Sequence, residues 1–249
     1  MVSYRVILAW LKYFAPSNIG LAIKILKHLL IISEADIHRG YKQALNKVTG
    51  WQPAASQRAA RWFFCGYASH AHESGPEMLR KFAEANRLTK KTDAGLFITP
   101  RDIPSLQLKS EDTIIFVDDL SGSGQQVLNG WQTMNELIAS DAKAHLILTA
   151  VTDRALRLIA QNTRLNVIAQ YVIPNKGNVF HDSCTFLAKN EKLALLKYCE
   201  KADSKVPRGY GDCGLLLVLS HKTPNNSIPI LHVYHKEWHG LFPRYLPTN

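Results

Sequence analysis

Strand-like apolar runs alternate with helical patterns through the middle of the chain, and this alternation constrains the fold more than any other feature. The predicted strands are residues 61–68, 94–99, 113–117, 145–151 and 167–173. The predicted helices between them are residues 75–86, 125–139 and 153–161. Strands that read as continuous apolar runs and alternate with helices are typical of a parallel sheet covered on both faces. We therefore predict an α/β fold with flanking helices.

The N-terminal segment has a different character. Helices are predicted over residues 3–14, 18–32 and from Ser33 to Leu45. The first 60 residues carry eight Lys or Arg against two acidic residues, a balance that suits an anionic partner such as nucleic acid. A winged-helix or other helix-turn-helix module is one interpretation, and a helical brace on the main domain is the other. The expected division is a basic helical unit over residues 1–55 and a second domain over residues 56–249.

Composition excludes several other classes of protein. Hydrophobic residues make up 46% of the 249 residues and charged residues 20%, which is ordinary for a globular chain with a full core. The four cysteines have no CxxC spacing, so we expect reduced thiols rather than a zinc site. Lys12, Pro16, Lys24 and Lys27 interrupt the apolar N-terminal runs, which excludes a signal peptide or membrane span there. We expect a cytoplasmic protein with no membrane partner.

One motif carries most of the chemistry: TIIFVDDLSGSGQQ, from Thr113 to Gln126. It predicts an apolar strand over residues 113–117 followed by Asp118 and Asp119, then a glycine-rich loop, and a helix that begins near Gln125. In a doubly wound sheet, ligands lie beyond the carboxyl ends of the strands, where this loop is expected. Glycines let backbone N–H groups approach an anion closely, and a helix N-terminus favours a phosphate. The two carboxylates suit ribose hydroxyls, or a magnesium ion bound through water.

A solvated loop that merely closes a strand is the alternative interpretation of DDLSGSG. The apolar strand before the loop, the helix after it and the strand–helix alternation of the region all favour the binding site.

The pattern resembles the phosphoribosyltransferase signature, in which apolar residues precede two acids and then a Thr/Ser-Gly phosphate loop. By this resemblance Asp118 and Asp119 match the acids that contact ribose and, with it, Mg²⁺. The phosphate-binding residues would be Ser121, Gly122, Ser123, Gly124, Gln125 and Gln126. The family usually has Thr or Ser where this chain has Gly122 and Gln126, so side-chain donors are lost while the backbone cradle is kept. The resemblance implies a type I phosphoribosyltransferase-like fold, a phosphoribosyl pyrophosphate or nucleotide ligand, and glycosyl transfer that these departures leave open.

In the same family a loop after the first core strand holds pyrophosphate. The corresponding residues here are 69–75, in which Ser74 and Gly75 at a helix start could bind an anion. Glu73 opposes an anion, and a plain helix cap at Ser74 is the alternative. His70 and His72 have no evident further ligands for a metal site.

More specifically, the chain resembles the phosphoribosyltransferase-like effectors of bacterial conflict systems, including those that accompany some retrons. The DDLSGSG loop, the N-terminal helical unit and the tail segments Thr223–Pro229 and Trp238–Arg244 carry this resemblance. It implies an effector or toxin in antiphage defence, with nucleic acid or a complex of reverse transcriptase and noncoding RNA as a partner of the basic unit. A non-catalytic nucleotide sensor and a nucleic-acid-binding regulator are the alternatives.

Two features of the tail have open interpretations. Asn225 and Asn226 either form a turn or reach the base of a ligand. Trp238, Phe242 and Tyr245 either pack in a core or form a hood over the site.

Overall fold

The computed structural model describes residues 2–67, 74–139 and 141–244, and these residues form two compact units. Unit 1 consists of residues 1–34 and 173–249, and unit 2 consists of residues 35–172. This grouping differs from the expected division near residue 55. The expected three-helix unit is not present, because its first two helices lie in unit 1 and its third lies in unit 2.

Unit 2 is built on a five-stranded sheet in the order β3-β2-β4-β5-β6. Its strands are β2 (Trp62–Gly66), β3 (Phe97–Ile98), β4 (Thr113–Ser121), β5 (Lys143–Thr152) and β6 (Asn166–Ile173). Its α-helices are α3 (Glu34–Asn46), α4 (Gly75–Ala85), α5 (Ile103–Leu106), α6 (Gln125–Leu137) and α7 (Asp153–Asn162). The pairs of β2 with β3, β2 with β4 and β4 with β5 are parallel. The predicted α/β class with a parallel sheet and flanking helices is confirmed.

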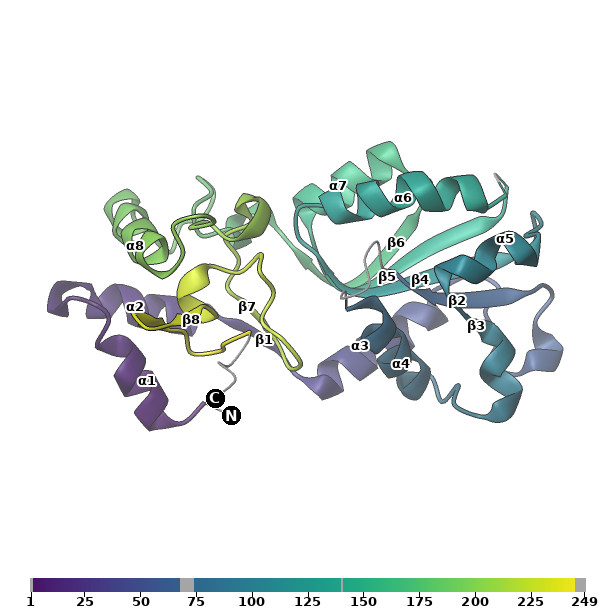
Figure 1. The fold of residues 1–249 in the computed structure, drawn as a ribbon, viewed down its shortest axis with the longest axis horizontal. Coiled ribbons are helices and arrows are strands. Elements are labelled where there is room, and N and C mark those ends of the chain that lie inside the picture. The colour runs from purple at the N-terminus through teal and green to yellow at the C-terminus, as the bar shows by residue number, and fades with distance from the viewer. Residues whose placement is uncertain (1, 68–73, 140, 245–249) are drawn as a thin grey trace. The chain divides into compact units, whose positions relative to one another are not determined.

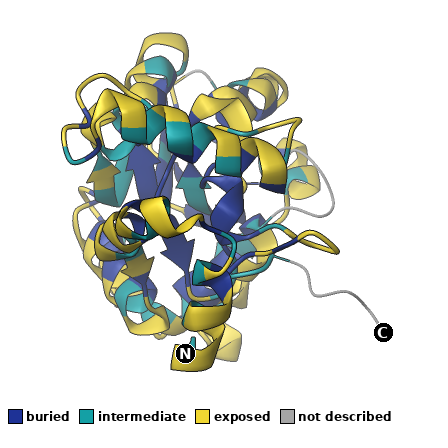
Figure 2. Cartoon of the chain, turned by 90° about the vertical axis from the view of Figure 1, so that its left-hand side faces the viewer, coloured by how far each residue is buried: buried dark blue, intermediate teal, exposed yellow. Residues whose placement is uncertain are grey.

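Helices cover both faces of this sheet: α6 and α7 lie on one face, and α3 and α4 lie on the other (Figure 1). The first layer is a core that includes Phe116 and Leu146 of the strands and Trp131 of α6. On the other face, Tyr41 of α3 and Phe64 of β2 both pack edge-on or tilted against Phe82 of α4. Figure 2 shows buried residues in the strands and exposed residues on the outward faces of the helices. Strands β2, β4 and β5 are mostly buried, and the edge strands β3 and β6 are only partly buried. The apolar face of α3 therefore belongs to this sheet, which is why α3 groups with unit 2.

Unit 1 joins the two ends of the chain. It contains α1 (Tyr4–Leu11), α2 (Ile19–Lys27), β1 (Leu30–Ile32), α8 (Lys189–Ala202), β7 (Leu217–Leu219), β8 (Tyr234–His235) and β9 (Trp238–His239). β1 pairs with β7 in parallel, and β8 pairs with β9 in an antiparallel hairpin. Residues 18–32 were expected to form one helix, but α2 ends at Lys27 and the last three residues form β1. The reason is a partner strand from the other end of the chain, which local periodicity does not reveal.

An aromatic cluster forms the centre of unit 1. The Trp10 and Trp238 Nε1–H groups both donate hydrogen bonds to the carbonyl of Ile230, at 3.0 and 3.1 Å. Trp238 is fully buried and stacks on Tyr13, with ring centroids 4.7 Å apart. The N-terminal helices α1 and α2 thus pack on the C-terminal tail. Trp238 belongs to this core.

The tail segment Thr223–Pro229 also forms hydrogen bonds within unit 1. The Ser227 N–H donates to the Pro224 carbonyl at 3.1 Å, which closes a turn around Asn225 and Asn226. The Asn226 side chain donates to the Tyr210 carbonyl at 3.0 Å, and the Ser227 hydroxyl donates to the Leu217 carbonyl at 2.7 Å. The turn interpretation therefore holds for these two asparagines. No helix of the described residues is long and apolar enough to cross a membrane.

Candidate functional site

The strand order of unit 2 creates a topological switch point between β2 and β4. From β2 the chain moves outward to β3 on one side, and from β4 it moves to β5 and β6 on the other. Ligands of open α/β sheets bind in the crevice at the carboxyl ends of the strands where the order reverses. Here β4 delivers Asp118 and Asp119 to that place, and the segment after β2 leads to Ser74. The topology therefore places the predicted acid pair at the switch point of the sheet, and ligand binding by these residues stays a prediction.

The two acids lie within strand β4 instead of directly after it. The strand was expected to end at Val117, but it continues to Ser121 and pairs Asp118 with Leu148 and Leu120 with Ala150. The strand continues because the long neighbouring strand β5 pairs with it. The polar residues after Val117 interrupt the apolar run, so the sequence pattern does not predict this extension. The backbone of the acids is consequently fixed by a sheet ladder, and the loop is limited to Gly122, Ser123 and Gly124.

Ser74 connects the segment after β2 to the acids. Its hydroxyl lies 2.6 Å from Asp118 Oδ1 and 2.9 Å from Asp119 Oδ1, so it can donate to either carboxylate. The Ser74 side chain makes no helix-capping hydrogen bond, although a cap was one of its two interpretations. Gly75 is required for packing, because a Cβ there would lie 2.4 Å from the Tyr67 carbonyl oxygen. An anion site at Ser74 and Gly75 stays a prediction, and His70, His72 and Glu73 lie outside the described residues.

Backbone groups also hold the acid pair. The Asp119 N–H donates to Asp118 Oδ1 at 2.9 Å, and the Leu120 N–H donates to Asp119 Oδ1 at 2.7 Å. The Asp118 side chain is buried, at 4% exposure, while that of Asp119 is half-buried. On the other side, the Tyr41 hydroxyl donates to the Asp118 carbonyl at 3.0 Å. The two carboxylates are therefore held rigidly, and Asp119 is the one open to a ligand.

The buried carboxyl of Asp118 has an altered proton affinity. Its pKa is raised well above the ordinary value, first because burial penalises the charged form and second because the Asp119 carboxylate lies beside it. The hydrogen bond from Ser74 acts in the opposite direction but is the weaker effect. A cation bound at this place, or a hydroxyl group that donates a hydrogen bond to the carboxylates, would stabilise the charged form of the pair.

The loop that follows β4 leads directly into α6, and it is the segment predicted to hold a phosphate. Gly124 has a φ of 84°, in the left-handed region that favours glycine, and it precedes the first turn of α6. A Cβ on Gly124 would lie 3.1 Å from Leu158 Cδ2 and 3.2 Å from Ala155 Cα of α7. The Ser123 hydroxyl accepts a hydrogen bond from the Gln125 N–H at 3.3 Å. The N-terminus of α6 therefore faces the loop with backbone N–H groups and a positive dipole end.

Thr152 fixes this loop and was not identified from the sequence. Its hydroxyl donates to the Gly122 carbonyl at 2.6 Å and accepts from the Ala155 N–H at 3.0 Å. It thereby caps α7 and ties the start of α7 to the cradle. The one local signal was its position directly before a predicted helix, which is typical of an N-cap. Its contact with Gly122 depends on the pairing of β4 with β5.

The predicted phosphate-binding residues differ in their exposure. Ser121, Gly122 and Gly124 are buried, Ser123 is half-buried, and Gln125 and Gln126 are exposed. The Gln125 side chain donates to Asn129 Oδ1 at 2.8 Å, along α6. Side-chain donors toward a phosphate are thus few, and the backbone provides most of the cradle.

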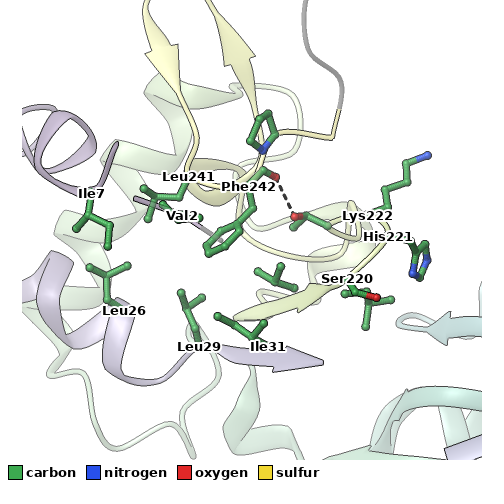
Figure 3. Close-up of a pocket in the computed structure, with 14 residues that line it drawn as sticks. Val2, Ile7, Leu26, Leu29, Ile31, Ser220, His221, Lys222, Leu241 and Phe242 are labelled. Atoms are coloured by element: carbon green, nitrogen blue, oxygen red, sulfur yellow. Dashed lines mark hydrogen bonds between the residues drawn. The ribbon is translucent and has the colours of Figure 1, made fainter. Parts of the chain in front are cut away.

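Unit 1 has a pocket of a different kind. It has a volume of about 690 Å³ and is lined mainly by aliphatic and aromatic side chains, including Leu26, Leu29, Leu241 and Phe242 (Figure 3). Ser220, His221 and Lys222 lie at one end of it, and the Thr223 hydroxyl donates to the Phe242 carbonyl at 2.8 Å. None of the residues predicted to bind a ligand lines this pocket.

A protein-family model described as PRTase-CE matches residues 7–244, which is nearly the whole chain and includes segments of both units. No curated protein matches the chain.

Proposed function

The chain belongs to the PRTase-CE family, a phosphoribosyltransferase-like family, and on that premise we propose that it binds a ribose 5-phosphate ligand, either phosphoribosyl pyrophosphate or a nucleotide. The observation that carries this proposal is the position of the Gly124 loop. The loop follows β4 at the switch point, faces the start of α6, and lies directly after the acid pair. The 5′-phosphate would bind the backbone N–H groups of Ser123 and Gly124, and it would replace the Ser123 hydroxyl as the acceptor of the Gln125 N–H. The ribose hydroxyls would bind Asp119 and Asp118.

Magnesium would complete this site. Mg²⁺ keeps several of its waters and binds proteins through one or two carboxylates together with ligand phosphates. Asp118 and Asp119 fit that requirement, and no group of three or more His, Cys, Asp or Glu side chains suited to a metal is present among the described residues. A magnesium ion held by this pair would belong to the complex with ligand. Asp118 would release its proton when the ion binds.

The chemistry that such a site can support is glycosyl transfer. In that reaction a leaving group departs from ribose C1 and a nitrogen nucleophile arrives, and the chain's contribution is positioning and electrostatic stabilisation. Asp118 and Asp119 would hold the ribose on the β4 side, while the loop would fix its 5′ end. Ser74 and Gly75, at the start of α4, would receive the departing pyrophosphate. Magnesium would supply positive charge to that leaving group.

A non-catalytic nucleotide sensor is the second candidate, and specific residues favour it. Gly122 and the exposed Gln126 replace hydroxyl donors of the family signature. Asp118 is buried and its pKa is raised, first by burial and then by the neighbouring Asp119 carboxylate, which disfavours its charged form. Both features retain binding of ribose phosphate and weaken the support for turnover.

In the cell we propose that the protein is an effector of bacterial antiphage defence, of the kind that accompanies retrons. Its partner would be nucleic acid or a complex of reverse transcriptase and noncoding RNA, recognised by basic N-terminal residues. Lys24 already pairs with Glu191 at 2.7 Å, so the exposed side chains of Lys27, Lys42 and Lys47 are the better candidates. If they bind RNA, reversal of these three charges should weaken a mobility shift of folded protein. An unchanged shift would remove this partner from the proposal.

Calorimetry tests the cradle directly. Phosphoribosyl pyrophosphate or a nucleoside monophosphate should bind the full chain in the presence of magnesium, and Gly124→Ala should weaken binding at least about tenfold because of its φ and its contact with α7. Gly95→Ala is the matched control, since Gly95 is exposed and a Cβ there meets nothing within 4 Å. Absence of binding by every such ligand would refute the proposal.

A second measurement separates the two candidates. Incubation with labelled phosphoribosyl pyrophosphate and each nucleobase should release pyrophosphate if the chain is a transferase. Binding without any product would instead identify the sensor.

A further inference from the structure

A hollow of about 450 Å³ adjoins the phosphate loop on the α7 side. Ser123 and Gln125 line it from the loop and the start of α6, and Arg154, Arg157, Leu158 and Gln161 line it from α7. Both arginines are exposed, and they lie one turn apart on α7. No acidic residue is part of this lining in the portion of the chain that the structure describes. The hollow is therefore a basic, polar surface that continues directly from the cradle.

The relation between the arginines and the loop is set by packing. The hydrogen bond from Thr152 to the Gly122 carbonyl fixes the start of α7 against the loop. Gly124 leaves space in which Ala155 and Leu158 approach, at distances that a Cβ on Gly124 would make tight. Arg154 precedes Ala155, and Arg157 precedes Leu158, in the helix. The two guanidinium groups therefore extend from a turn of α7 whose backbone is anchored at the cradle.

A single phosphate does not require this hollow. The backbone N–H groups of the loop and the α6 N-terminus suffice for one phosphate. Guanidinium groups are suited to phosphate oxygens, which they can bind through two parallel hydrogen bonds. The volume of the hollow also exceeds what one phosphate occupies and lies within the range of small-ligand sites.

We propose that this hollow is a subsite for a second phosphate, joined to the 5′-phosphate that lies in the cradle. The ligand class would then be a nucleotide extended at its 5′ end by a pyrophosphate linkage, either a nucleoside 5′-diphosphate or a dinucleotide joined through pyrophosphate. This inference rests on the proposed function, since it assumes that a 5′-phosphate occupies the loop. Ser123 would lie between the two phosphates, and Arg157 and Arg154 would bind the outer one.

The test compares AMP, ADP and NAD⁺ by calorimetry on the full chain with magnesium held constant. ADP, NAD⁺ or both should bind at least about tenfold more tightly than AMP, which is the gain expected from one charge-assisted contact. Arg154→Gln with Arg157→Gln should abolish this preference and leave AMP affinity unchanged. Arg157→Gln alone should reduce the preference, and it keeps the test valid if the double variant does not fold. Arg101→Gln is the matched control, because Arg101 is an exposed arginine of unit 2 outside the hollow.

The outcomes separate the two proposals. Equal affinity for all three nucleotides, or a preference that survives the Arg154 and Arg157 substitutions, would overturn the subsite and leave the cradle in place. Failure of all three to bind, together with failure of phosphoribosyl pyrophosphate, would overturn the proposed function and the subsite with it. A preference for NAD⁺ over ADP would identify the dinucleotide, and the reverse would identify the diphosphate.

Discussion

The two hollows of this protein differ in the groups that line them. The hollow in unit 2 lies beside a glycine loop, a helix N-terminus and two arginines, whereas the pocket in unit 1 lies among leucine, isoleucine and phenylalanine side chains. The acid pair Asp118 and Asp119 and the left-handed Gly124 therefore lie together in unit 2, at the carboxyl end of β4. In unit 1 the tryptophans and the tail's asparagine and serine are bonded to backbone carbonyls. The contrast indicates that the polar groups of unit 1 serve its packing, whereas the groups proposed to bind a ligand lie in unit 2.

Trp238→Ala tests the role of packing in unit 1, and of the changes described below it should lower the free energy of unfolding most. The substitution removes a fully buried ring and its hydrogen bond to Ile230, and such truncations cost about 3–5 kcal/mol. Urea unfolding of unit 1, followed by fluorescence or circular dichroism, would measure the loss. Trp238→Phe is the control, because it keeps most of the volume and should cost less.

The same variants test whether ligand recognition is confined to unit 2. We expect Trp238→Phe to bind phosphoribosyl pyrophosphate or nucleotide with unchanged affinity. A folded Trp238→Phe protein with a large loss of affinity would break the comparison, since it would give unit 1 a part in the site.

The acid sensitivity of unit 1 provides the second test. Burial lowers the pKa of His232 from 6.5 to about 4, and its Nε2 lies 3.2 Å from the Ser227 carbonyl. The unfolded chain takes up the proton first as pH falls, so this stability is complete above about pH 6.5 and is lost progressively down to about pH 4. The loss should amount to about 3 kcal/mol, from the size of the pKa shift.

Urea unfolding between pH 7 and pH 4 would measure this dependence. His232→Gln keeps an N–H donor near Ser227 and removes the titration, so its unfolding free energy should depend less steeply on pH. Equal slopes for the two proteins would show that His232 is not the source of the acid sensitivity.

The sequence predicts the sheet of unit 2 well because each of its strands is an apolar run, and the Asp118–Gly124 motif follows one of them. It does not predict the features that depend on distant partners. Residues 30–32 form a strand because Leu217–Leu219 pair with them, and local periodicity extends the preceding helix over them instead. Strand β4 continues through two acids because β5 pairs with it. Ser74 and Thr152 complete the site through contacts that no local pattern encodes.

Asp118→Asn should change the free energy of unfolding less than the changes described above, and it should raise this free energy instead of lowering it. The folded-state pKa of Asp118 is raised, so the folded chain retains this proton while the unfolded chain loses it. Stability therefore falls as pH rises above the ordinary Asp value of about 3.9 and stops falling above the raised pKa. Asn removes this loss, because its amide stays neutral and its oxygen can accept the bonds from Ser74 and the Asp119 N–H. The gain at neutral pH should be on the order of 1 kcal/mol, or roughly 2–4 °C in Tm.

Binding should change in the other direction in the same protein. Asp118→Asn removes one of the two charges proposed to hold magnesium and ribose, so magnesium-dependent affinity for phosphoribosyl pyrophosphate should fall. Asp119→Asn is the matched control: its carboxylate is half-buried, and we expect it to lose affinity with less gain in stability. If Asp118→Asn were less stable than the natural chain at neutral pH, the charge at Asp118 would be a structural requirement of the fold. A more stable protein that no longer binds ligand would instead show that the Asp118 carboxyl destabilises the fold and is needed for binding. Unit 2 would then differ from unit 1, whose buried polar groups stabilise the fold.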